Sequence, residues 1–135
     1  MGRPVLILLD THVVIWLASG ETRISRRAQS AIDEARQSVR GIAISDFTLV
    51  ELSMLFRKKQ FKLAISPETF LSEVEHRFVV LPITANIALR ALELPANYPK
   101  DPADRIIGAT SLIEDIPLIT ADAEIRRSRA VPTIW

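Results

Sequence analysis

The acidic residues whose positions suit joint chemistry are Asp10, Glu51, Asp104 and Asp122. Asp10 directly follows a continuous apolar run, 5–9, and Asp122 follows a second run, 117–120, by two residues. Runs that are apolar on both faces are typical of buried parallel strands, whose carboxyl ends lie at one edge of the sheet. Glu51 and Asp104 fall on helices next to such strands. We therefore predict that these acids converge, although they are distant in the chain.

Carboxylates crowded into one pocket repel each other, which raises their pKa values and destabilises the fold unless a cation is bound. Mg²⁺ and Mn²⁺ accept oxygen ligands, retain several waters and pair with substrate phosphates. Such an ion polarises a phosphodiester and activates a water. The sequence has no cysteine, which excludes disulfides, zinc-thiolate sites and thiol catalysis. We predict an Mg²⁺ or Mn²⁺ site that hydrolyses phosphodiesters.

Each acid also has a purely structural interpretation. Asp10 and Asp122 stand where they could cap the helices that follow them. Asp101 and Asp104 flank Pro102 at a helix start, where acids favour the helix dipole. We assign Asp101 to that structural role, whereas Asp104 can also bind metal. Glu51 has apolar neighbours, and a charge in such surroundings needs a partner.

Hydroxyl groups close to these acids are predicted to hydrogen-bond the carboxylates or the ion, and capping roles are equally good for all of them. They belong to Thr11, Ser45 and Thr120. The two histidines, His12 and His76, are isolated in the sequence, so we expect packing or surface roles. Trp16, four residues after His12, is expected in the core or at an interface.

Strand and helix patterns alternate from end to end. The predicted strands cover 5–9, 42–45, 78–83, 117–120 and 131–135. The predicted helices cover 11–18, 25–40, 46–59, 66–76, 84–93, 101–114 and a short segment from 122. This order predicts one α/β domain over 1–135, with a parallel sheet between helices on both faces. In such sheets ligands bind beyond the carboxyl ends of the strands, where the strand order reverses.

The composition is that of an ordinary globular protein, with 48% hydrophobic and 24% charged residues in 135. The formal net charge of +1 gives no reason to expect nucleic-acid binding. No apolar run approaches the ~20 residues of a membrane helix, and the first residues do not resemble a signal peptide. We therefore expect a cytoplasmic protein without a membrane partner.

Several stretches together resemble a known family. They are LLDTHVVIW at 8–16, ISDFTLVEL at 44–52, LPITANIALRALELP at 81–95, KDPADRIIGAT at 100–110, LITAD at 118–122 and the terminal VPTIW. In this order they resemble the PIN-domain nucleases, especially the VapC-type toxins of toxin–antitoxin systems. The chain departs from the family pattern at Asp46, which would add a negative charge at the mouth of the site.

The resemblance implies a three-layer α/β/α sandwich around a short parallel sheet. It also implies a ribonuclease that depends on Mg²⁺ or Mn²⁺, with Asp10, Glu51, Asp104 and Asp122 as metal-binding and catalytic residues. VapC-type proteins commonly form homodimers and are inhibited by an antitoxin that covers the active-site groove. The alternative is a non-catalytic PIN-like scaffold that binds RNA or protein.

Basic residues near the predicted pocket would then hold the RNA backbone. Those expected to do so are Lys100, Arg105, Arg57 and Lys58, with the segment 57–62 extending the track. The same residues could instead contact an acidic antitoxin.

Overall fold

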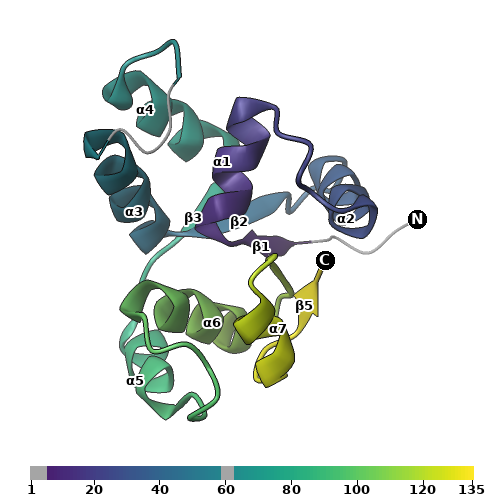
Figure 1. Ribbon diagram of the computed structural model, residues 1–135, viewed down its shortest axis with the longest axis vertical. Helices are drawn as coiled ribbons and strands as arrows, with labels where there is room; N and C mark the ends of the chain where they lie inside the picture. The colour runs from purple at the N-terminus through teal and green to yellow at the C-terminus, as the bar shows by residue number, and fades with distance from the viewer. Residues whose placement is uncertain (1–5, 59–62) are drawn as a thin grey trace.

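A parallel sheet forms the centre of the molecule in the computed structural model, which describes residues 6–58 and 63–135 (Figure 1). In chain order, the elements of these residues are β1 (Ile7–Leu9), α1 (Thr11–Ser19), α2 (Arg26–Arg36), β2 (Ile42–Ser45), α3 (Asp46–Arg57), α4 (Pro67–Arg77), β3 (Val79–Leu81), α5 (Ala85–Glu93), α6 (Pro102–Glu114), β4 (Leu118–Ile119), α7 (Ala123–Ser128) and β5 (Thr133–Ile134).

The strand order is β3-β2-β1-β4-β5, and every pairing is parallel. β1 lies in the middle, with Ile7 opposite Ile42 of β2 and Leu8 opposite Leu118 of β4. The chain first builds outward from β1 through β2 to β3, then returns to place β4 on the other side of β1. The order therefore reverses between β1 and β4, which is where open parallel sheets bind ligands.

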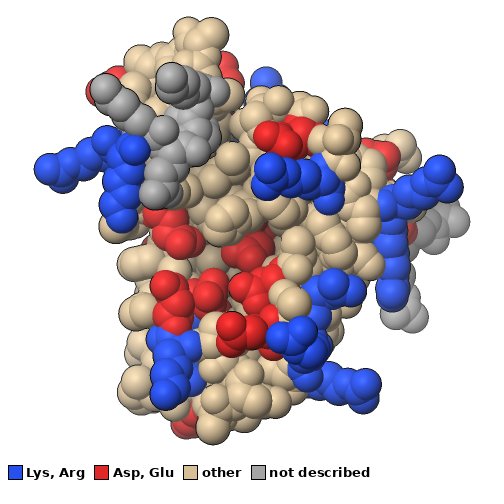
Figure 2. Space-filling model, viewed as in Figure 1, with Lys and Arg blue, Asp and Glu red and all other residues tan. Residues whose placement is uncertain are grey.

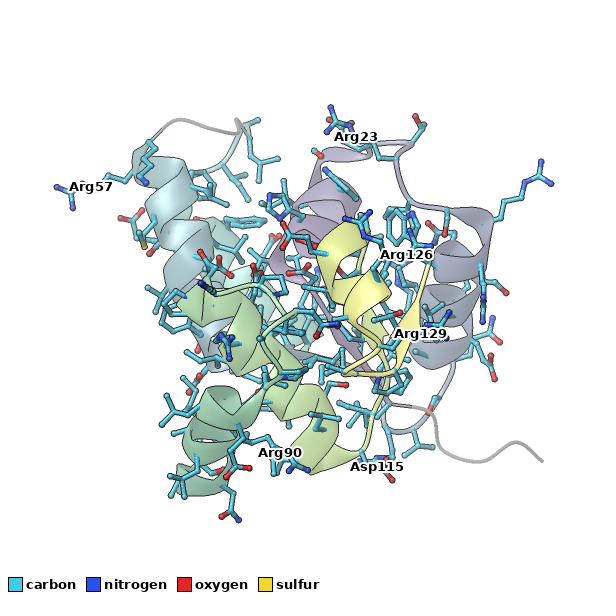
Figure 3. The ribbon with its side chains drawn as sticks, turned by 60° about the horizontal axis from the view of Figure 1, so that its bottom comes forward. Arg23, Arg57, Arg90, Asp115, Arg126 and Arg129 are labelled. Carbon is cyan, nitrogen blue, oxygen red and sulfur yellow. The ribbon has the colours of Figure 1, made fainter. Side chains whose placement is uncertain are left out.

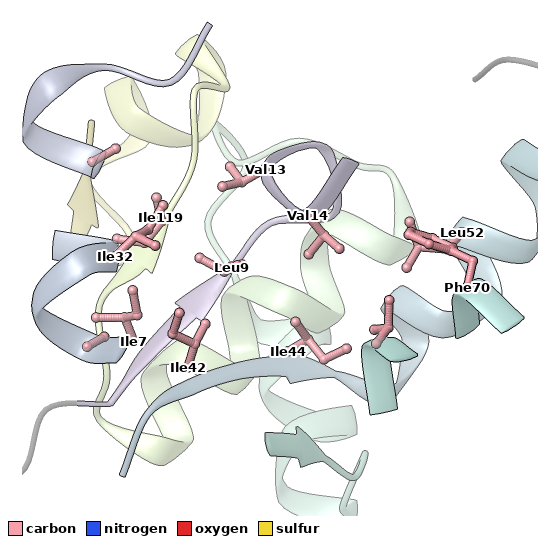
Figure 4. Packing of buried hydrophobic residues seen from close by; sticks show 13 residues of the cluster. Ile7, Leu9, Val13, Val14, Ile32, Ile42, Ile44, Leu52, Phe70 and Ile119 are labelled. Atoms are coloured by element: carbon pink, nitrogen blue, oxygen red, sulfur yellow. The ribbon is translucent and has the colours of Figure 1, made fainter. Parts of the chain in front are cut away.

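Side chains of the strands alternate between two apolar layers because successive residues point to opposite faces. Ile7 and Leu9 face a layer that includes residues of α1 to α4 (Figure 4). Leu8 and Ala43 face the other layer, which is covered by α6 and α7. α5 packs on α6 through Ile87. The predicted α/β sandwich is therefore confirmed.

Several predicted elements are longer than those in the structure. The predicted strand 78–83 is reduced to β3 because the Phe78 N–H donates to the Val74 carbonyl at the end of α4, and Pro82 has no N–H. The helix predicted to reach Arg40 ends at Arg36. Beyond it Val39 is 99% exposed, so a longer helix would bury no apolar side chain there. The first two residues of the predicted strand 5–9 are Val5, outside the described residues, and Leu6, which precedes β1.

None of the described helices has the length and apolar character that crossing a membrane requires.

Candidate active site

A cavity of about 330 Å³ lies at the carboxyl edge of the sheet, where the strand order reverses. Its lining residues are Asp10, His12, Trp16, Glu51, Asp101, Asp104, Ala121 and Asp122. Figure 2 shows acidic side chains gathered in a central hollow of this face, with Lys and Arg side chains around it. The acids singled out in the sequence thus share one cavity with Asp101.

Asp10 is positioned by the end of β1 and by the start of α1. One carboxylate oxygen, Oδ1, accepts a hydrogen bond from the Thr11 N–H at 2.8 Å, and Oδ2 accepts one from Thr120 Oγ1 at 2.7 Å. The side chain caps α1 and is only 7% exposed. Burial raises the pKa of Asp10, and the two hydrogen bonds oppose this effect. The capping role and the place in the cavity are therefore compatible.

Glu51 reaches the cavity from α3 and is held by hydroxyl groups. Thr11 Oγ1 donates to Glu51 Oε1, and Thr48 Oγ1 lies 3.0 Å from Thr11 Oγ1. Because Thr11 gives its single hydroxyl proton to Glu51, Thr48 is the donor to Thr11. Burial raises the pKa of Glu51, while the bond from Thr11 lowers it. Sequence reasoning missed Thr48, although its spacing of three from Glu51 places both on one helix face.

Asp122 and Asp104 complete the set from α7 and α6. Asp122 Oδ1 caps α7 by accepting from the Ile125 N–H at 3.0 Å, and its own N–H donates to Thr120 Oγ1. Asp104 lies in the first turn of α6. Burial, and then the nearby charge of Asp10, raise the pKa of Asp104 to about 7.

The remaining polar residues predicted to support the acids bind backbone. Asp101 Oδ1 accepts from the N–H groups of Ala103 and Asp104, so it caps α6 as expected while also lining the cavity. Ser45 caps α3 by accepting from the Phe47 N–H at 3.1 Å, rather than contacting the acids. Thr11 and Thr120 do contact carboxylates, as described above.

Arg105 has a structural task that differs from the predicted contact with RNA. Its Nη1 donates to the carbonyl oxygens of Ala91 at 3.1 Å and Leu94 at 3.4 Å. The guanidinium therefore ties α6 to the end of α5. The physical reason is that the last carbonyls of a helix lack partners within that helix, and a nearby cation satisfies them.

The other predicted RNA contacts lie on the surface. Lys100, Arg57 and Lys58 are exposed, and Figure 3 shows Arg57 pointing into solvent at the end of α3. The rest of the predicted track, 59–62, lies outside the described residues. Asp46, expected at the mouth of the site, instead accepts a bond from the Ile83 N–H at 3.2 Å, next to β3.

The charges of the cavity suit a divalent cation. Within residues 6–58 and 63–135, no Lys or Arg forms an ion pair with the acids that line it, since the ion pairs there join Arg23 with Glu21, Arg36 with Asp33 and Arg90 with Glu93. Carboxylate oxygens that no Lys or Arg neutralises are the donor set that Mg²⁺ and Mn²⁺ prefer. Among the described residues no three His, Asp or Glu side chains form a group that could hold one ion together, and Mg²⁺ usually keeps several waters and takes only one or two protein carboxylates.

The raised pKa of Asp104 predicts how stability depends on pH without metal. Between its ordinary value of 3.8 and about 7, the folded protein holds a proton on Asp104 that the unfolded chain has lost. Stability should therefore fall as pH rises through this window. Because the side chain is partly exposed and screened, we expect a loss of about 1–2 kcal/mol between pH 5 and 8.

This expectation is checked by thermal unfolding in EDTA at several pH values, with Asp104→Asn as the comparison. The Asn variant should show a shallower decline because it has no proton to lose at this position. Equal slopes for the two proteins would contradict the assignment. Addition of Mn²⁺ should reverse the trend, since metal binds the deprotonated carboxylates.

Comparison with known proteins identifies a family and several relatives. The PIN domain family matches residues 7–130. Ribonuclease VapC22 of Mycobacterium tuberculosis (strain ATCC 25618 / H37Rv) is 32% identical over 131 residues, which cover 96% of this chain and 98% of that protein. A toxin–antitoxin complex from Klebsiella pneumoniae contains a chain that is 26% identical, with 86% of each chain covered and a TM-score of 0.61.

A further solved structure shares the fold at lower identity. VapBC2 from Rickettsia felis, bound to a DNA fragment from its promoter, superposes with a TM-score of 0.69 at 16% identity, covering 96% of this chain and 97% of that one.

A parallel sheet with an acidic cavity where its strand order reverses defines an α/β protein whose candidate active site is built from carboxylates. The chain belongs to the PIN-domain family and, within it, to the VapC-type proteins.

Proposed function

We propose that the chain, as one domain over 1–135, is a metal-dependent endoribonuclease and the toxin of a VapBC-type system, acting in the cytoplasm. The observation that carries this proposal is one cavity, at the edge of the sheet where the strand order reverses, that is lined by Asp10, Glu51, Asp104 and Asp122. Membership of the VapC-type proteins supports it, because the relative from Mycobacterium tuberculosis is named a ribonuclease. A non-catalytic scaffold would have no need of this unpaired set of acids.

In this proposal the four acids hold Mg²⁺ or Mn²⁺. When bound, such an ion polarises the phosphodiester and lowers the pKa of the attacking water. The protein's own hydroxyl groups orient the ligands: Thr120 and the Thr11 N–H fix both oxygens of Asp10. Thr11, supported by Thr48, fixes Glu51.

Exposed cations around the hollow are suited to contact the RNA backbone. Lys100 directly precedes Asp101 at the cavity, and α7 carries Arg126 and Arg127 in its last turn. Contacts of this kind position the nucleic acid without reading its sequence. Arg57 and Lys58, at the end of α3, would extend the contact along the RNA backbone.

The proposal predicts that cleavage needs a divalent cation. Purified protein is incubated with total RNA in Mg²⁺, in Mn²⁺ and in EDTA, and the products are resolved by electrophoresis. We expect EDTA to lower the rate at least about 100-fold, because the ion supplies several kcal/mol of transition-state stabilisation. Restoration by added Mn²⁺ is the matched control. Cleavage that persists in EDTA would contradict the metal site.

We also propose a VapB-type antitoxin partner and a homodimer. The solved toxin–antitoxin complexes with this fold support the first. A second, larger hollow of about 620 Å³ offers a surface for an amphipathic segment. Its lining is mostly apolar, with Leu17, Ile65 and Phe78 among its residues, and it also contains the charged residues Arg36, Glu73 and Arg77. Co-expression with the product of the neighbouring gene should give a stable complex that no longer cleaves RNA. A complex that cleaves as fast as the free protein would count against an inhibitor.

A further inference from the structure

α1 presents two ring side chains to the carboxylate cavity. His12 and Trp16 are four residues apart, so they lie on one face of the helix, and both line the cavity beside the acids. The neighbours of Trp16 in the chain, Ile15 and Leu17, pack against the apolar core. Trp16, expected in the core or at an interface, is half-buried and lines the cavity.

The ring of Trp16 is held in place by other rings and by a cation. Its centroid lies 6.2 Å from that of His12 and 5.8 Å from that of Trp135, with tilted planes. The Arg23 guanidinium lies 5.8 Å from the Trp16 centroid. Trp135 follows β5 and itself packs on the core, so it anchors the group. Because β5 runs parallel to β1, its end lies at the same edge as Asp10.

A held indole beside an acidic cavity suits a nucleobase. The cavity's own charge repels phosphates, so affinity for nucleic acid has to come from a bound cation and from contacts that do not depend on charge. Stacking on an aromatic ring is such a contact, and it accepts any base. A base joined to the phosphate at the carboxylates lies only a nucleotide's length away, within reach of α1.

We infer that Trp16, flanked by His12 and supported by Trp135 and Arg23, stacks against an unpaired base next to the cleaved phosphodiester. This inference rests on the proposed function and adds to it a residue that positions one base of the RNA. The role of Trp16 is to position the substrate, so its removal should weaken binding more than it slows the chemical step.

The first test separates binding from chemistry. Trp16→Ala, Trp16→Phe and the wild type are compared for cleavage of a ten-nucleotide oligoadenylate in Mg²⁺. Loss of one base stack should raise KM about tenfold for Trp16→Ala with little change in kcat, and Trp16→Phe should retain most of the affinity. Leu92→Ala, which removes an exposed apolar side chain from α5 (81% exposed), is the matched control and should change neither constant. Melting curves confirm that each variant is folded.

The second test detects the stack directly. The chain has two tryptophans, so Trp135→Phe leaves Trp16 as the sole source of tryptophan fluorescence, which is excited selectively at wavelengths where Tyr98 does not absorb. Stopped-flow mixing with oligoadenylate should quench its fluorescence before cleavage, whereas an abasic ribose-phosphate oligomer of equal length should not. In the reciprocal variant, Trp16→Phe, the remaining Trp135 should respond much less.

The failures are distinguishable. If the wild type cleaves no RNA with any divalent ion, the proposed function and this inference fall together. If the wild type cleaves RNA but Trp16→Ala has an unchanged KM, or the abasic oligomer quenches equally, only the inference is wrong. If Trp16→Ala cleaves normally but no longer binds the antitoxin, Trp16 belongs to a protein interface, and the inference is also wrong.

Discussion

RNA cleavage by an Asp10→Asn variant is expected to be about 10³-fold slower than by the wild type, or slower still. Asn keeps the size of the side chain and one acceptor oxygen, but it has no negative charge for a cation. Asp10 is the most buried acid of the cavity, and loss of about 4 kcal/mol of electrostatic stabilisation corresponds to this factor. The measurement is single-turnover cleavage of a labelled RNA in Mn²⁺.

The folded state should tolerate this change. Burial already raises the pKa of Asp10, so an uncharged side chain removes a repulsive charge in the metal-free protein. We expect the variant to melt at the same temperature as the wild type in EDTA, or higher. Added Mn²⁺ should stabilise it less than the wild type, which reports metal binding independently of cleavage.

Asp115→Asn is the matched control. Asp115 is exposed at the end of α6, has φ of 56°, and is labelled in Figure 3. Asn adopts this left-handed conformation readily, so the same chemical change is made without strain. This variant should cleave at the wild-type rate. An Asp10→Asn protein that retained a tenth of the wild-type activity would show that Asp10 does not bind the essential ion.

Gly108→Ala is expected to destabilise the fold by about 2 kcal/mol, although alanine is the better helix former. Gly108 lies in α6, where the substitution would by itself contribute about 1 kcal/mol of stability. A Cβ at this position, however, would overlap Tyr98 Oη and lie 2.7 Å from Tyr98 Cζ. Forcing a buried ring to move costs about 3 kcal/mol, so the clash outweighs the helix preference.

The Tyr98 ring cannot move cheaply. It is 1% exposed, and its hydroxyl donates to the Asp104 carbonyl at 2.7 Å. Displacing it would break this bond in the first turn of α6, next to the cavity. We therefore expect Gly108→Ala to weaken Mn²⁺ binding as well as to lower the free energy of unfolding.

Urea denaturation of a double-mutant cycle checks this explanation. In a Tyr98→Ala background the obstructing ring is absent, so Gly108→Ala should become neutral or stabilising. Gly41→Ala is a useful comparison, because a Cβ there meets nothing within 4 Å and only its positive φ of 76° causes strain. If Gly108→Ala were equally destabilising with and without the tyrosine ring, the contact would not be the cause.

The helix starts were predictable because their determinants are local. The side chains of Ser25, Ser66 and Thr84 accept hydrogen bonds from N–H groups three residues later in the chain. Each cap therefore depends on only four consecutive residues. The alternation of apolar runs and helical patterns likewise predicts a parallel sheet between helices. An acid that directly follows such a strand is expected at the carboxyl edge of the sheet. The positions of the four acids relative to these segments predicted the whole set, and the family resemblance pointed to the same residues.

The partners of polar side chains were not predictable in the same way. Arg105 follows Asp104 in the chain, which suggested a place at the cavity, yet its guanidinium lies on the last carbonyls of α5. Trp16 was expected in the core or at an interface, and the packing of α1 places it at the carboxylate cavity. A helical residue's direction depends on how the helix packs, which adjacent sequence does not specify.

The sequence alone determined which acids are present, which segments become strands and helices, and where most helices begin, because interactions within about four residues decide these features. The tertiary structure decided what the acids contact. Thr120 donates to Asp10 across 110 positions, and Thr11 to Glu51 across 40. Such contacts form only when the strands are arranged in the order β3-β2-β1-β4-β5. A hydrogen bond requires its two heavy atoms to lie within about 3 Å of each other in space, whatever their separation in the chain.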